Sequence, residues 1–125
     1  MSVLPTTFTK VVNEQSTAIY TAVLRDQNNV IIPLADISTL TISLCTLDGT
    51  IVNSRTDQDA LNINGVTVDA LGVLTFVMDP ADTTIIFPLS TDVYEIHRAT
   101  FKMVYSGGSS NWDVDINVRN LLHVT

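Results

Sequence analysis

Apolar and polar residues alternate strictly near the C-terminal end of this 125-residue chain. The apolar set is Trp112, Val114, Ile116 and Val118, and the polar set between them is Asp113, Asp115, Asn117 and Arg119. Because successive side chains of a β-strand point to opposite faces, this pattern gives a strand one apolar and one polar face. The segment is therefore predicted to be a half-buried strand, and a helix is excluded there.

The same pattern recurs along most of the chain in short segments bounded by Gly, Pro, Asn or Asp, which is typical of an all-β sandwich or barrel. Seven or eight strands are expected. They are drawn from nine candidate segments, at about 8–13, 17–25, 30–32, 39–45, 51–52, 66–68, 74–78, 93–105 and from 111 onward. Between them we expect a crossover at 34–38, a loop at 53–64 with one helical turn near 57–61, a capped helical turn at 79–83 and a hairpin loop at 106–110.

Length and charge narrow the class of protein. A chain of 125 residues matches one domain with a sizeable core. The formal net charge is −7, and the six basic residues are scattered along the sequence. Nucleic-acid binding requires clustered Lys and Arg, so direct DNA or RNA binding is not expected.

The cysteine content and the N-terminal sequence indicate in which cellular compartment the protein is made. Cys45 is the single cysteine, which rules out an internal disulfide. The first residues lack the basic and apolar regions of a signal peptide, and no apolar stretch approaches the roughly 20 residues that span a bilayer. We therefore expect synthesis in the cytoplasm.

One loop is a candidate calcium site. Asp57 and Asp59, followed by Asn62 and Asn64, offer several oxygen ligands. The glycine at the sixth position and the terminal glutamate of an EF-hand loop are both missing, so an ordinary solvated loop is the favoured interpretation. We expect no metal and no cofactor.

The two histidines and one pair of aspartates are candidate catalytic groups. Asp113 and Asp115 share a strand face, which is the outward face of an amphipathic strand. His97 and His123 could act as a base or a zinc ligand, but neither lies in a zinc motif. His97 has the same parity as Phe101, which predicts a partly buried structural histidine. We expect no catalytic residue and no enzymatic activity.

The order of turns and strands resembles a known family. The runs that carry the resemblance are 22–34, 40–44, 48–52, 64–68, 72–76 and 79–83, with a final hairpin of 99–105 and 112–118. They resemble the immunoglobulin-like modules of tailed bacteriophage virion proteins, of the baseplate, neck or capsid-associated type. The Cys and Trp pattern of antibody domains is missing. The resemblance implies a small β-sandwich mounted on a capsid, neck, tail or baseplate, and it implies no catalytic residue.

The sequence thus predicts an all-β protein, an immunoglobulin-like antiparallel β-sandwich of seven or eight strands. Residues 1–7 are predicted to be an N-terminal arm, and residues 8–125 a single domain. In the arm, Val3, Leu4 and Pro5 are the candidate residues for docking on a neighbouring subunit.

We expect a non-enzymatic structural protein of a phage particle. It would be made in the host cytoplasm and assembled in the virion in symmetric multiple copies with other virion proteins, away from membranes and nucleic acid. The alternative is a module of a phage fibre that binds a host surface or glycan through loops at one end. Exposure of Trp112 or Tyr94 would favour the glycan alternative, and their burial would favour the structural role.

Overall fold

The computed structural model describes residues 9–121, which contain eight strands and one short 3-10 helix. The elements are β1 (Thr9–Asn13), β2 (Ala18–Val23), η1 (Leu34–Asp36), β3 (Ile37–Thr46), β4 (Gln58–Asp59), β5 (Val66–Val68), β6 (Val73–Met78), β7 (Tyr94–Tyr105) and β8 (Gly108–Arg119). The predicted arm, with Val3, Leu4 and Pro5, lies outside the described residues, as do Phe8 and His123.

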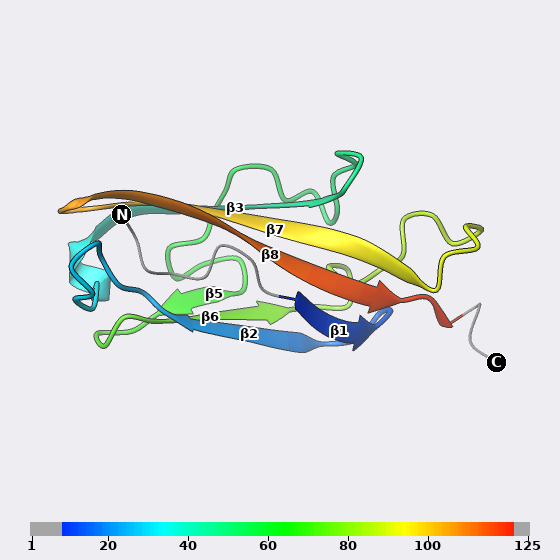
Figure 1. The fold of residues 1–125 in the computed structure, drawn as a ribbon, viewed down its shortest axis with the longest axis horizontal. Helices are drawn as coiled ribbons and strands as arrows, with labels where there is room; N and C mark the ends of the chain where they lie inside the picture. The colour runs from blue at the N-terminus through cyan, green and yellow to red at the C-terminus, as the bar shows by residue number, and fades with distance from the viewer. Residues whose placement is uncertain (1–8, 122–125) are drawn as a thin grey trace.

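Two sheets are stacked face to face (Figure 1). One has the strand order β1-β8-β7-β3-β4 and the other the order β2-β6-β5. Strand β1 runs parallel to β8, and every other pair is antiparallel. Strands β3, β7 and β8 of one sheet face strands β2, β6 and β5 of the other. In immunoglobulin domains, strands C, F and G face strands B, E and D in the same way. The fold is an immunoglobulin-like β-sandwich, as predicted.

An aromatic cluster from both sheets fills the centre of the core. The ring of Phe101 on β7 stacks on Trp112 of β8 at 5.1 Å between centroids. From the facing sheet, Phe76 packs edge-on at 5.9 Å and Tyr20 stacks at 6.1 Å. The predicted inward set of β8 is confirmed, since none of its four residues is more than 3% exposed. The alternation read from the sequence is therefore the pattern of core contacts between the layers.

The helical turn predicted near 57–61 is wrong. Gln58 and Asp59 instead form β4, which pairs with Thr41 and Ile42 at the edge of β3. The backbone N–H of Ala60 also donates to Leu40 O at 2.8 Å. Residues 58–60 have no apolar periodicity, but they are extended because they hydrogen-bond to the free backbone groups at the edge of β3.

The predicted hairpin loop at 106–110 is too long. Strand β8 begins at Gly108, which pairs with Tyr105, so only Ser106 and Gly107 form the turn. The small residues that suggest a loop continue the ladder, because pairing with the long strand β7 satisfies their backbone groups. Gly108 has a φ of +149°, which glycine adopts without a steric penalty.

Three other predicted elements are reduced to turns or single bridges. The segment at 30–32 is not a strand, although the hairpin forms through a bridge between Arg25 and Ile31. Ile51 likewise makes one bridge, to Cys45. At 79–83 the capping carboxylate of Asp79 accepts the N–H of Ala81 at 2.9 Å, but the chain makes a hydrogen-bonded turn and no helix. These segments are too short to add further ladder hydrogen bonds.

Candidate interaction site

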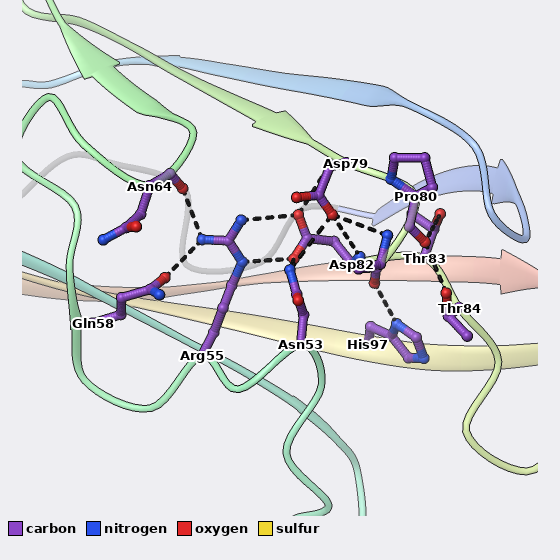
Figure 2. Close-up of polar contacts among 11 residues, drawn as sticks. Asn53, Arg55, Gln58, Asn64, Asp79, Pro80, Asp82, Thr83, Thr84 and His97 are labelled. Atoms are coloured by element: carbon purple, nitrogen blue, oxygen red, sulfur yellow. Dashed lines mark hydrogen bonds and ion pairs between the residues drawn. The ribbon is translucent and has the colours of Figure 1, made fainter.

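A buried ion pair joins the loop between β3 and β4 to the loop between β6 and β7 (Figure 2). The guanidinium of Arg55 donates from Nε to Asp82 Oδ1 at 2.6 Å and from Nη2 to Asp82 Oδ2 at 3.0 Å. Its Nη1 donates to Gln58 Oε1 and to the carbonyl oxygen of Asn64. The guanidinium carbon also lies 5.2 Å from the ring centroid of Phe76, within cation–π range. The cation is therefore satisfied on every side.

The partner carboxylate is equally well satisfied. Asp82 accepts hydrogen bonds from Asn53 Nδ2 at 2.9 Å and from the backbone N–H of Asp79 at 3.0 Å. Its own carbonyl oxygen accepts a hydrogen bond from Nδ1 of the buried His97 at 2.8 Å (Figure 2). The cluster fixes the beginning of the β6–β7 loop on the body of the sandwich, and its role is structural.

The carboxylate of Glu95 holds the next part of the same loop. It accepts the backbone N–H groups of Ile86 at 2.8 Å and Phe87 at 2.9 Å. It also contacts His97 Nε2 at 2.5 Å. Because the carbonyl of Asp82 can only accept, Nδ1 of His97 is the donor of the hydrogen bond between them. One histidine on β7 thus connects both anchoring points of the loop.

A groove of about 820 Å³ lies between this loop and the turn after β3. Both segments lie at the end of the sandwich where β7 begins (Figure 1). Its apolar lining includes Leu47, Ile86, Phe87, Pro88, Leu89 and Tyr94. Leu89 is 88% exposed, and Phe87 and Tyr94 are each 45% exposed. Large apolar side chains concentrated around one concave surface are typical of a binding site.

The charged groups of the groove are all acidic. Asp48, Asp92 and Glu95 line it, and no Lys or Arg does within the part of the chain that the structure describes. The side-chain hydroxyl of Thr46 and the N–H and hydroxyl of Thr50 donate to Asp48, which lowers the pKa of its carboxyl. The groove therefore keeps negative charge at its rim, and it suits an apolar ligand that carries positive charge.

Replacing Glu95 with alanine tests how the groove is held. Two backbone N–H groups would lose their acceptor and His97 Nε2 would lose its contact, so we expect the free energy of unfolding to fall by about 1.5–3 kcal/mol. Amide exchange at Ile86 and Phe87 should accelerate, as measured by hydrogen-exchange NMR. The control is Asp92→Ala, which removes a groove carboxylate that does not accept these N–H groups. Unchanged exchange in Glu95→Ala would contradict the anchoring role.

The oxygen-bearing side chains of the candidate calcium loop bond to different parts of the protein. Asp57 contacts Ser43 and Lys102, whereas Asp59 Oδ1 accepts the N–H of Leu61. Asn62 Oδ1 is taken by the N–H of Val68. Across residues 9–121, no three His, Cys, Asp or Glu side chains are grouped so as to hold a metal ion.

The candidate catalytic residues that the structure describes make contacts that stabilise the fold. His97, predicted to be a partly buried structural histidine, is completely buried. Asp115 forms a bidentate pair with Arg98, and Asp113 accepts from Thr100 on the outward face of the larger sheet. In the described part of the chain, no helix is long and apolar enough to cross a membrane.

Exposure of Trp112 or Tyr94 would favour a glycan site, and these two residues differ in burial. Trp112 is 3% exposed and belongs to the core. Tyr94 is 45% exposed and lines the groove. The groove itself was missed, although the run from Ile85 to Leu89 holds five consecutive apolar residues outside any alternating segment. Such a run between two strands was the available signal.

Comparisons with known proteins found similarity only among solved structures, since no family model and no curated protein matches the chain. An endo-beta-1,4-mannanase from Thermotoga petrophila is 13% identical, with 89% of this chain and 18% of that chain covered and a TM-score of 0.46. The titin domains Z1Z2 in complex with telethonin are 16% identical, with 95% and 47% covered and a TM-score of 0.47. The titin M3 domain is 12% identical, with 95% of both chains covered and a TM-score of 0.43.

The chain therefore spans less than a fifth of the mannanase and about half of the Z1Z2 chain. Similarity at this level carries no information on activity, ligands or partners. The class of protein, an immunoglobulin-like β-sandwich, rests on the strand order described above.

Proposed function

We propose that this protein is a non-enzymatic structural component of a tailed phage particle that acts through protein–protein contacts. The groove between the turn after β3 and the β6–β7 loop is the docking site in this proposal. Its occupant is an apolar segment of another virion protein that carries Lys or Arg beside its apolar side chains.

The observation that carries the proposal is the exposed apolar lining of an anchored groove. Leu89 and Phe87 present large apolar surface to solvent, while Glu95 holds the backbone beneath Phe87. A preformed site loses little conformational entropy when it binds, so a partner would gain most of the free energy of burying these side chains. The acidic rim adds a preference for a basic partner.

The assignment to a phage particle rests on the sequence resemblance. That resemblance implies a position on a capsid, neck, tail or baseplate, in the virion after synthesis in the host cytoplasm. Many identical copies on a symmetric particle would let each contact be weak, since avidity multiplies their effect. The N-terminal arm with Val3, Leu4 and Pro5 remains a predicted second contact.

One observation favours a second function, recognition of a host glycan. Tyr94 and Phe87 expose aromatic surface in the groove, and the carboxylates of Asp48 and Asp92 could accept hydrogen bonds from hydroxyl groups. A glycan array with the wild-type chain separates the two functions. Binding that is lost in Tyr94→Ala would favour the glycan function over the structural one.

Replacing Leu89 with aspartate should strongly reduce incorporation of the chain into phage particles. The change puts a negative charge at the most exposed apolar position of an acidic groove, so we expect at least a tenfold loss of the chain from purified particles. Quantitative mass spectrometry of the particles measures this loss. The matched control is Leu71→Asp, because Leu71 is 69% exposed in the β5–β6 turn at the opposite end of the sandwich (Figure 1). Equal incorporation of both variants would contradict the assigned groove.

A further inference from the structure

Within residues 9–121, one edge of β2 in the smaller sheet has no strand paired with it. Its other edge pairs with β6 from Ala18 to Val23, and no strand within residues 9–121 pairs with the outer edge. The six residues of β2 include no charge and no proline. Edges of this kind pair readily with another strand, because nothing blocks their backbone groups.

Hydrogen bonds on both sides of β6 show which groups of β2 face outward. The N–H of Leu24 donates to Gly72 O, so the even-numbered residues of β2 bond toward β6. The N–H of Val77 donates to Gly65 O, so the odd-numbered residues of β6 bond toward β5, which gives the same parity. Backbone groups of an antiparallel strand alternate between its two neighbours. Those of Ile19, Thr21 and Val23 therefore point to the open edge.

The other described sheet edges are protected. On β5, the outward N–H groups of Val66 and Val68 donate to Ile63 O and to Asn62 Oδ1 within the same loop. Strand β4 has only two residues and includes an aspartate, and β1 has five residues and includes a lysine. Short edge strands and charged residues are devices that prevent pairing. Strand β2 has neither.

The side chains beside the open edge are compatible with a second copy of this chain. The outward face of the smaller sheet is entirely β-branched and uncharged, with Ile19, Thr21, Val23, Thr67, Val73, Thr75 and Val77. The outward face of the larger sheet carries charged pairs such as Arg98 with Asp115. Two copies of a chain with net charge −7 repel each other, and this face brings no charges together.

We propose that two copies of the chain dimerise by pairing their β2 strands antiparallel about a two-fold axis at Thr21. The two three-stranded sheets then form one continuous sheet, and Thr21 lies opposite Thr21 of the second copy. Ile19 lies opposite Val23, so the β-branched face continues across the axis. About six backbone hydrogen bonds would join the copies. A two-fold arrangement closes both open edges at once, so the assembly stops at two. The dimer does not depend on the groove or on the phage assignment.

Analytical ultracentrifugation of the full chain tests this dimer. At a concentration of roughly 100 µM, the sedimenting species of the wild type should have twice the 13.6 kDa mass of one chain. Thr21→Lys places two like charges at the axis and should raise the dissociation constant at least about tenfold. Thr21→Glu alone should do the same. An equimolar mixture of the two variants should recover a dimer, because only residue 21 of the second copy lies opposite residue 21.

Two controls distinguish this dimer from other modes of association. Thr67→Lys adds a charge to the same face on β5, away from the axis, and should leave the dimer intact. Deletion of residues 2–7 should also leave it intact. A monomeric wild type, a dimer that persists in Thr21→Lys or a mixture that fails to recover would overturn the proposal. So would loss of the dimer in Thr67→Lys, which indicates stacked faces, or in the deletion, which indicates an exchanged arm.

Discussion

Replacing Phe101 with alanine should lower the free energy of unfolding by about 3–5 kcal/mol. The ring has no exposed surface, and it contacts Trp112 in its own sheet and Phe76 and Tyr20 in the facing sheet. Its removal leaves a cavity between the layers and deletes three aromatic contacts, each of which adds to simple burial. Because small domains are stable by only about 5–15 kcal/mol, the variant should lose much of its stability.

Denaturation in urea, followed by tryptophan fluorescence and circular dichroism, measures this loss. The matched control is Val104→Ala on the same strand, because Val104 is 46% exposed on the opposite face. That change should cost less than about 0.5 kcal/mol. Equal costs for the two variants would contradict the placement of Phe101 at the centre of the core.

Replacing Arg55 with methionine should also lower the free energy of unfolding by about 3–5 kcal/mol. The change leaves the carboxylate of Asp82 buried without its cation, and it removes the donors to Gln58 and Asn64. The double variant Arg55→Met with Asp82→Leu removes both charges, and it should be less destabilised than the sum of its single changes. A double-mutant cycle from urea denaturation measures the difference.

A second bidentate pair provides the comparison. Arg98 donates from Nε and Nη2 to Asp115, with the same geometry, but the side chain of Arg98 is 40% exposed. Solvent screens such a pair, so Arg98→Met should cost no more than about 1 kcal/mol. If Arg55→Met proved as mild as Arg98→Met, the buried cluster would not anchor the loops as described.

The sheets could be predicted because burial on one face imposes a period of two. The inward residues of β3, β6, β7 and β8 follow that period over five or more positions, so the core could be read directly from the sequence. The expected hairpins also formed, since Asp26 and Asp48 accept nearby backbone N–H groups within their turns. In these segments local sequence and tertiary packing favour the same structure.

Elements that depend on distant partners could not be predicted. The segment of Gln58 and Asp59 is extended only because the edge of β3 is available to it. The pairing of Arg55 with Asp82 joins loops 27 positions apart, and no local pattern marks either residue. The groove is likewise formed by two loops that the sequence separates, so only its apolar run at 85–89 was visible in advance.

We propose that the chain is an assembly module that docks through the end of its sandwich. A cryo-electron microscopy map of purified particles from a phage that encodes the chain would test this proposal. We expect density for the two-sheet domain in several symmetric copies, with Leu89 and Phe87 buried against a neighbouring virion protein. Particles that lack the chain, or copies whose groove faces solvent, would contradict it.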